Sequence, residues 1–498
     1  MPKQTFALTR LAGAAALLLA TAPAAWAELQ APTLWQDWQD LYNRLGGTLG
    51  SQSAEYSNGK LVLEGLNYRT EMGGVVSRTD FGSVTMIEQP DGSVVIEVPT
   101  ESVAQTSSIA DGAQIDQSIT TRHQNLSIVA RDEGEGRVYD IAADTITIEV
   151  DSIVTEGDQA GEPYTVTMRM AGAESEYRSG LGADGDGFAQ TSRFDGLDIA
   201  SNYSDSGDEF NFTYVLTGVT SDFEGTFGGI PAGPVKGLSD MNITYDGTIG
   251  HSGSTLSMVG LAPGGPLDVS GTSQGGAMAL NLGEESLGYS ISSTGGKFSA
   301  LVPGFPVPIN ISMAEVGSAL TLPFGEPGVE KPFGLQISLR DLVLDDTLWG
   351  MFDPTGQLPR DPATLVLDMD GSAVMNIDVF GDPEAVAGMA ESPGNLKTLT
   401  LNQLLLNIAG AELRGSGDLD FPTETPIPEP VGTIELALDG GFTLIDKIVA
   451  LGFIPAQQAA FVKGMAGAIT RPVGDDQLES TIEFTPGGGI SANGMPLK

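Results

Sequence analysis

Four aspartates, Asp353, Asp361, Asp368 and Asp370, are the residues whose types and spacing come closest to a hydrolytic site. The first two each precede a proline, and the last two alternate with apolar residues. Paired carboxylates can serve as acid and base in glycoside hydrolysis. An aspartate before proline also favours extended or turn backbone, and its side chain can accept a hydrogen bond from a nearby N–H. We therefore expect turns for the first pair and a solvent-facing strand for the second, with carboxylate catalysis as the alternative.

A second candidate is the segment Gly271–Gly275, which fits the G-x-S-x-G pattern of a nucleophile elbow. An elbow needs a strand, a sharp turn and a helix, and a general-base histidine later in the chain. The residues that follow Gly275 alternate like a strand, and both histidines, His123 and His251, precede Ser273. The segment therefore predicts a glycine-rich hairpin turn. The two histidines lie in loop-like segments and are too few for a three-histidine zinc site.

Metal and cofactor chemistry has little support elsewhere in the chain. Asp184 and Asp186 are oxygen ligands at a spacing of two, but the further ligands of an EF-hand are missing, so we expect a plain turn, with weak Ca²⁺ binding as the alternative. The chain has no cysteine, which excludes disulfides, thiolate metal sites and cysteine nucleophiles. We expect no cofactor and no enzymatic activity.

Most of the chain before residue 346 alternates apolar and polar residues with a period of two. Ile146, Ile148 and Val150 share one side of such a segment, and the turn sequence Gln89–Gly92 separates two β-branched runs. This pattern predicts antiparallel sheets with one buried face and one solvent-facing face. The fold class that follows is mainly β, with large antiparallel, twisted sheets, few helices and an α+β C-terminal part.

These strands raise the question of what covers their apolar side. Few helices are expected there, so the sheet must fold on itself or leave an apolar concavity. We expect such a cleft to be lined by Met168, Met170, Phe210, Phe212 and Tyr214. The alternative is that these five residues fill a closed sandwich core.

One helix is expected near the N-terminus. Leu34, Trp38, Leu41 and Leu45 recur at helical spacing, and two glycines follow them. This apolar stripe should pack on the sheet that follows.

The remaining helices are expected after residue 345. A short helix should begin at an Asp346 N-cap and end at Pro354, with Trp349 and Phe352 as core anchors, and another should span residues 382–391. Two more should flank Pro455, the second with the following residues facing inward: Ala459, Val462, Met465 and Ile469. We therefore divide the chain into a β-rich region with an N-terminal helix, 28–345, and an α+β region, 346–498.

The first 27 residues predict a signal peptide. Lys3 and Arg10 form a basic start, an apolar stretch follows, and Ala25-Trp26-Ala27 supplies the small residues at which signal peptidase cleaves, before Glu28. No later segment is a run of about 18 uncharged apolar residues, so we expect no transmembrane span after cleavage. In a Gram-negative cell this predicts the periplasm.

The chain is strongly acidic, with a formal net charge of −42, and −44 once the two basic residues of the signal peptide are removed. Such a surface repels nucleic acid and anionic lipid headgroups. With 41% hydrophobic residues the composition is that of a folded protein and not of an acidic disordered tail.

Several long segments resemble the DUF2125 family of exported alphaproteobacterial proteins. They include the early "LWQDW" helix, "LWGMFDP", "LTLNQLLLNIAGAELRGSGDLDF", "LIDKIVALGFIP" and the closing "ISANGMPL". The strand pair around "GAELRGSGDL" is also similar to segments of AsmA-like periplasmic β-proteins. The resemblance implies an exported envelope protein and carries no active-site residue.

The function expected from these observations is that of an exported, non-enzymatic β-rich protein of the cell envelope that binds an apolar ligand or a protein partner. The candidate partners are therefore a lipid or an envelope protein, and nucleic acid is not expected. The alternative is a secreted, carboxylate-dependent hydrolase that acts on envelope glycans. The sequence leaves the oligomeric state open.

Overall fold

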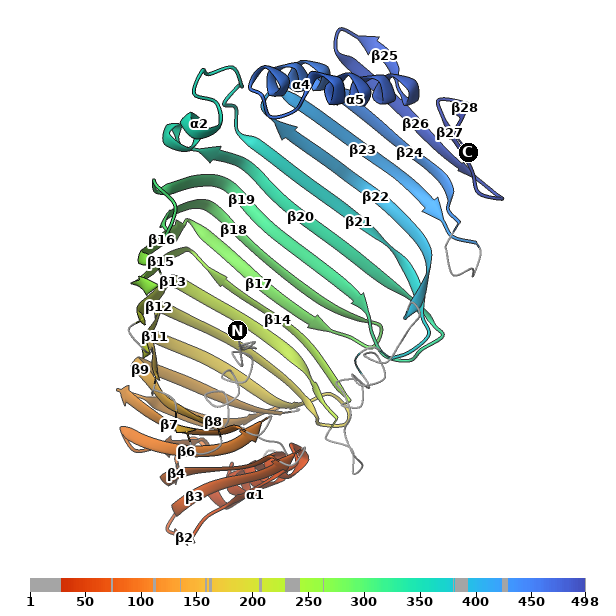
Figure 1. Ribbon diagram of the computed structural model, residues 1–498. Helices are drawn as coiled ribbons and strands as arrows, with labels where there is room; N and C mark the ends of the chain where they lie inside the picture. Colours follow the sequence, from red (N-terminus) through yellow and green to blue (C-terminus); the bar gives the residue numbers. More distant parts are fainter. Residues whose placement is uncertain are drawn as a thin grey trace. The chain divides into compact units, whose positions relative to one another are not determined.

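The computed structural model consists of long antiparallel strands and few helices, which confirms the mainly-β fold class with helices in the C-terminal part (Figure 1). It describes residues 28–497, with gaps at 73–74, 111–112, 135, 157–158, 161–163, 206–207, 229–241, 263, 379, 381–392 and 423–428. The expected signal peptide and the helix expected over residues 382–391 lie outside the described residues.

The chain divides into two compact units. Unit 1 comprises residues 1–194 and 224–230, and unit 2 comprises residues 195–223 and 231–498. This division by contacts does not test the boundary at residue 345 that the expected C-terminal helices suggested, which stays a prediction.

Unit 1 is built on an antiparallel sheet in which β3 and β9 each pair with several strands. β1 and β2 both pair with β3, β3 pairs with β4, and β9 pairs with β7, β8, β10 and β11. The strands of this unit are β1 (Gly47–Gly50), β2 (Ser53–Ser57), β3 (Lys60–Met72), β4 (Val75–Glu88), β5 (Val94–Glu97), β6 (Glu101–Ala110), β7 (Ala113–Gln124), β8 (Ser127–Glu133), β9 (Gly136–Glu156), β10 (Gln159–Ala160) and β11 (Tyr164–Leu181).

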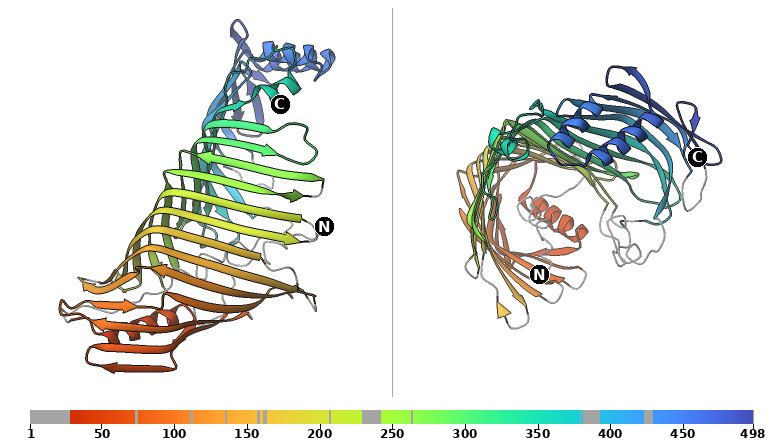
Figure 2. Two further views of the ribbon diagram at one scale, coloured as in Figure 1. Left: turned by 90° about the vertical axis from the view of Figure 1, so that its left-hand side faces the viewer. Right: turned by 45° about the horizontal axis from the view of Figure 1, so that its top comes forward.

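Helix α1 (Ala31–Arg44) covers the apolar face of this sheet, as its periodicity predicts (Figure 2). Leu34, Trp38 and Tyr42 are fully buried among apolar residues of β3, β4, β5 and β8. The Trp38 indole N–H donates a hydrogen bond of 3.2 Å to the Tyr139 hydroxyl on β9. The N-cap residue of α1, Gln30, makes no capping hydrogen bond with its side chain. The carboxylate of Glu88 in β4 instead accepts a hydrogen bond of 2.9 Å from the Ala31 N–H.

A buried ion pair fixes α1 to β9. Asp37 of the helix accepts a hydrogen bond from the Arg137 guanidinium, which also donates to Asp132 over 3.0 Å. Both Asp37 and Arg137 are almost completely buried. A charge at such a depth is tolerated only with its partner, so the pair specifies the position of the helix on the sheet.

Several long strands contain one left-handed residue at which the apolar alternation changes phase. In β3, Leu61 and Leu63 precede Gly65 and Leu66 follows it, yet all three leucines are buried in the same core. Gly65 has φ +61°, and the register with β4 shifts at this point. A left-handed residue inside a strand acts as a β-bulge that places neighbouring side chains on one side. Asp341 has the same role in β20, where φ is +54° and the register with β21 shifts between Leu339 and Leu342.

Unit 2 is a long succession of antiparallel strands, each twisted relative to the next (Figure 2). β12 (Gly187–Asp205) and β13 (Asp208–Phe227) contribute to both units. The other strands are β14 (Ile243–His251), β15 (Gly253–Ala262), β16 (Gly265–Ser273), β17 (Gly275–Leu282), β18 (Ser286–Leu301), β19 (Ile309–Pro323), β20 (Glu330–Leu344), β21 (Ala363–Met375), β22 (Gly394–Ile408), β23 (Ala411–Asp420), β24 (Val431–Asp439), β25 (Arg471–Gly474), β26 (Gln477–Thr485), β27 (Gly489–Ala492) and β28 (Met495–Pro496).

Three described helices belong to unit 2: α2 (Asp346–Phe352), α4 (Gly441–Ala450) and α5 (Ala456–Ile469). The N-cap of α2 is Asp345, whose side chain accepts from the Leu348 N–H at 2.8 Å, so the expected cap at Asp346 was wrong by one residue. The core anchor of α2 is Leu348, whereas Phe352 is exposed, contrary to expectation.

The two helices around Pro455 are confirmed, but the expected orientation of the second is only partly right. Ala459 of α5 is buried, whereas Val462 and Met465 are exposed. The expected inward stripe assumed a wide apolar contact. The helix instead buries only Ala459 and leaves most of its apolar side chains exposed.

Candidate apolar ligand face

The strands of unit 2 align their apolar residues in rows that run across the sheet. Directly opposed residues in neighbouring antiparallel strands lie on the same face. One row crosses β17 to β22 through Leu280, Tyr289, Leu320, Leu335, Met369 and Leu401. A parallel row consists of Met278, Ile291, Ser318, Ile337, Leu367 and Leu404. We call the surface that these twelve residues form the apolar face.

The apolar face continues toward the C-terminal strands through directly opposed residues. Ile434 of β24 lies opposite Ile482 of β26, and Leu438 lies opposite Leu478. Leu436 lies opposite Ser480, whose hydroxyl donates a hydrogen bond of 2.6 Å to the carbonyl oxygen of Ile469 in α5. The C-terminal end of α5 therefore lies over this end of the face.

The apolar face is open between β17 and β20. Tyr289 is 40% exposed, Ile291 47% and Leu320 40%. Leu280 and Ile337 have similar exposed fractions. By contrast, Leu63 of β3, which lies in the core beneath helix α1, is fully buried. Contiguous exposed apolar surface of this kind marks a binding surface in soluble proteins.

The opposite face of the same strands is small and polar. Ser290 lies opposite Ala319, Ala319 opposite Gln336, and Gln336 opposite Asp368. The sheet therefore separates an aliphatic side from a hydrophilic side over many strands.

A shallow hollow of ≈ 290 Å³ lies over the residues of β18 to β22 on the polar side. The charged side chains that line this hollow already have hydrogen-bond or ion-pair partners within the protein. Glu315 accepts a 3.0 Å hydrogen bond from the Ser338 hydroxyl and lies 3.7 Å from the Arg340 guanidinium. The hollow follows from the small side chains of Gly317 and Ala319, and we assign no ligand to it.

The five residues expected to line a cleft fall in both units. Met168 and Met170 lie on β11 in unit 1 and are half-buried, opposite Ile148 and Ile146 of β9. Whether they line a cleft stays a prediction.

Phe210, Phe212 and Tyr214 lie on the part of β13 that belongs to unit 2, and they too are half-buried. Phe212 heads a row that continues through Met258 and Val269 to Ala300, and the last two are buried. The sequence therefore identified an apolar part of unit 2. The more exposed residues of β17 to β20 were missed, although strict alternation of large aliphatic and small polar residues in "AMALNL" and "GYSISS" is a visible signal.

Three of the four aspartates considered for catalysis accept hydrogen bonds from neighbouring groups: Asp353, Asp368 and Asp370. Asp368 and Asp370 lie two residues apart on the polar face of β21 and both accept hydrogen bonds from the Asn402 side chain. Asp361 is exposed in the loop before β21. No hydrogen bond or ion pair links either of the loop aspartates to the strand pair in the described residues.

Asp353 is fully buried and organises the turn after α2. Its carboxylate accepts from the Leu358 N–H at 2.7 Å and from the Thr355 hydroxyl at 3.3 Å. Burial alone raises the pKa of Asp353, but the N–H groups of Gln357 and Leu358 outweigh it and hold the pKa below its ordinary value. A carboxylate fixed in its ionised form is suited to capping a turn and not to donating a proton.

The remaining motifs also have structural positions. Gly271–Gly275 does not form the expected hairpin turn, because β16 and β17 are separated only by Gln274 and both pair with β18 in one continuous register. The Ser273 hydroxyl lies 2.6 Å from the Ser254 hydroxyl on β15. The histidines differ from expectation, since His123 lies within β7 and His251 ends β14, both half-buried. Asp184 and Asp186 lie in the turn between β11 and β12. The described residues contain no cluster of three or more acidic or histidine side chains able to hold a metal ion.

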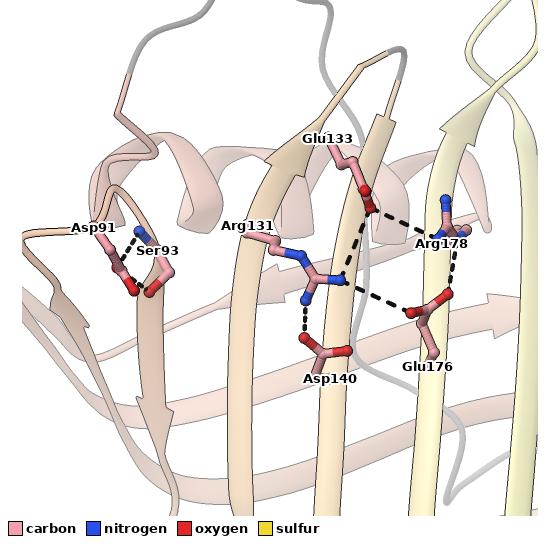
Figure 3. A network of polar contacts seen from close by, with 7 residues as sticks. All are labelled: Asp91, Ser93, Arg131, Glu133, Asp140, Glu176 and Arg178. Carbon is pink, nitrogen blue, oxygen red and sulfur yellow. Dashed lines mark hydrogen bonds and ion pairs between the residues drawn. The ribbon is translucent and has the colours of Figure 1, made fainter.

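A charged cluster in unit 1 joins β8, β9 and β11 (Figure 3). Arg131 forms ion pairs with Asp140, Glu133 and Glu176, and Arg178 contacts Glu176 at 2.8 Å. Each side chain is about one-third to one-half exposed, and the charges alternate, so the cluster is a cross-strand surface network of modest energy. Each charged side chain of the cluster has an oppositely charged partner within it.

None of the described helices combines the length and the apolar character that crossing a membrane requires. The sequence matches no model of a known protein family, and no curated protein matches it. The resemblance to the DUF2125 family therefore stays a prediction.

Proposed function

We propose that the protein is an exported, non-enzymatic envelope protein that holds the hydrocarbon chain of a lipid on the apolar face. The observation that carries this proposal is the pair of aliphatic rows across β17 to β22, open to solvent between β17 and β20. Opposed residues of neighbouring strands are about 4.8 Å apart along a row. Six strands therefore offer an apolar track of roughly 24 Å, a length that suits an extended alkyl chain.

The chemistry of the rows favours a hydrocarbon over a protein partner. Protein interfaces are enriched in Tyr, Trp and Arg, with hydrogen bonds distributed through them. The two rows contain Leu, Ile and Met almost throughout, with Tyr289 and Ser318 as the exceptions. A ligand that matches such rows has no hydrogen-bonding groups along its length.

The test is a titration of the purified protein with a fluorescent fatty acid, together with native mass spectrometry for chains that co-purify. Ile291→Asp places a carboxylate in the middle of the apolar face, and we expect it to lower affinity about tenfold or more, because a charge cannot be desolvated against hydrocarbon without a large cost. Ser292→Asp is the matched control, since Ser292 is the exposed neighbour on the opposite face of the same strand.

The proposal fails if the protein neither co-purifies with a lipid nor binds the probe. It also fails if Ile291→Asp and Ser292→Asp bind the probe as the unchanged protein does. A hydrolytic activity on envelope glycans that Asp368→Asn abolishes without unfolding would establish the alternative reaction instead.

Export to the periplasm is part of the proposal and has its own test. The basic start, apolar stretch and small-residue site of residues 1–27 support it. We expect the mature chain to begin at Glu28 and to be released with the periplasmic fraction. A mass that retains residues 1–27 would contradict cleavage.

A further inference from the structure

The most exposed large apolar side chains of unit 2 lie on and before helix α5. Phe461 is 67% exposed and Met465 is 56% exposed, and Phe453 and Val462 are similar. We propose that α4 and α5 dock the protein onto the surface of a lipid bilayer. This inference extends the proposed function by naming the surface with which the apolar face exchanges its ligand, but the docking is tested separately.

The composition of the two helices points to an apolar surrounding. Residues 441–470 contain only three charged residues, Asp446, Lys447 and Lys463. The ammonium of Lys463 pairs with Asp446 at 2.6 Å, which ties α5 to α4. A helix that is apolar on nearly all sides is ordinarily buried in protein or membrane, yet α5 buries only Ala459.

The covered side of the helix pair lies on the end of the apolar face. A Cβ added to Gly441 of α4 would lie 2.5 Å from the Leu438 side chain, and the end of α5 accepts the hydrogen bond from Ser480. Both contacts are with residues that continue the face through β24 and β26. A bilayer seated on α5 would therefore be continuous with the apolar face.

Helix α2 adds exposed apolar residues at the same end of the strands. β20 and β24 run in the same direction because three antiparallel strands separate them, so α2 and α4 begin at the same edge (Figure 1). Met351 and Phe352 of α2 are both exposed. The patch thus extends over more than one helix.

Charge distinguishes a bilayer from a second copy of the chain. The whole chain carries −42, whereas residues 441–470 carry one acidic and two basic residues. A near-neutral patch on an acidic protein suits zwitterionic headgroups, while two acidic copies repel one another. The stems of Lys447 and Lys463 can lie along the interface with their ammonium groups in water, as in helices that lie in a membrane interface.

The experiment is co-sedimentation of the purified protein with phosphatidylcholine vesicles. We expect the unchanged protein to bind and Phe461→Ser/Met465→Ser to bind about tenfold or more weakly, since burial of a single Phe side chain has an effect of that order. Val103→Ser/Ile153→Ser removes two exposed apolar residues from unit 1 and should bind normally. Adding phosphatidylglycerol should weaken binding at low salt, and NaCl should restore it.

Docking is refuted if the unchanged protein does not sediment with neutral vesicles or if the helix variant binds equally well. It is also refuted if the protein is a dimer in solution that the helix variant converts to a monomer, because a second copy then covers α5. The ligand face is separable: Ile291→Asp should still bind vesicles, and the helix variant should still bind the fatty acid probe. Vesicle binding without probe binding would overturn only the ligand face.

Discussion

The ion pair between Arg137 and Asp37 is the residue-scale contact on which the position of α1 depends. Arg137→Met removes the partner of a buried carboxylate, and we expect unit 1 to lose about 3–5 kcal/mol of unfolding free energy. Urea unfolding followed by the fluorescence of Trp35 and Trp38 would measure the loss. The double variant Asp37→Leu/Arg137→Met should recover most of it, because a well-packed apolar pair avoids the desolvation cost.

The matched comparison for Arg137 is Arg178, which belongs to the exposed network of Figure 3. Arg178→Met should cost less than about 1 kcal/mol. Equal losses from the two variants would show that burial of the Arg137 pair has no special importance for stability.

Asp476 makes a second residue-scale contact that can be followed by pH. Its carboxylate accepts from the N–H groups of Phe442 and Thr443 at 3.0 and 2.8 Å and so caps α4. Partial burial raises its pKa, but the hydrogen bonds from Thr443 and Phe442 outweigh this and lower the pKa below the ordinary value of 3.8. Asp476→Asn should therefore destabilise unit 2 at neutral pH by about 1 kcal/mol.

The sign of the pH dependence follows from the lowered pKa. The carboxylate of Asp476 stabilises the fold fully above its unfolded pKa near 3.8, and this stabilisation is lost as pH falls through the folded value. Thermal melts of the unchanged protein and Asp476→Asn should therefore converge as the pH falls below the lowered folded pKa of Asp476. Asp475→Asn, at the exposed neighbouring position, should melt like the unchanged protein at every pH.

At the scale of elements, helix α5 buries one small side chain of its own, that of Ala459. Ala459 is 4% exposed, and its neighbour Ala460 is exposed. Ala459→Glu should detach the helix and lower the melting temperature of unit 2, because a carboxylate would be forced into the contact. Ala460→Glu introduces the same side chain one position away and should leave the melting temperature nearly unchanged. Equal melting of the two variants would contradict the orientation of α5.

The helices illustrate how far local sequence signals reach. The spacing of Leu34, Trp38 and Leu41 was enough to predict α1, and Pro455 marked the start of α5. The N-terminal acceptors of α1 and α4 could not be predicted, because Glu88 and Asp476 come from turns or strands far along the chain. Rules for helix starts consider the residue that precedes the helix, and here those residues are Gln30 and Gly440.

The strands show a similar limit. Alternation correctly predicted antiparallel sheets, but strict period two fails at left-handed residues such as Gly65 and Asp341, where the register with the neighbouring strand shifts. The candidate face was only partly predictable for a related reason. A sequence shows which residues alternate, whereas the exposure of Tyr289 and Ile291 depends on whether any distant segment covers them.

At the scale of the whole molecule, the dominant property is a net charge of −42. Repulsion among like charges opposes the folded state, and salt screens it. The melting temperature should therefore rise as NaCl increases from 10 to 500 mM, and choline chloride should act equally at the same ionic strength. A much larger rise with CaCl₂ at matched ionic strength would instead indicate a specific Ca²⁺ site.

From β18 to β24, every strand is hydrogen-bonded to the strand that follows it in the chain. Order along the sheet therefore equals order along the polypeptide, as in repeat proteins whose stability is a sum of nearest-neighbour terms. Inserting or deleting one hairpin here would lengthen or shorten the aliphatic rows by about 10 Å while leaving each neighbouring contact intact. If the apolar face holds an alkyl chain, as we propose, the number of consecutive strands sets the longest chain that it can cover.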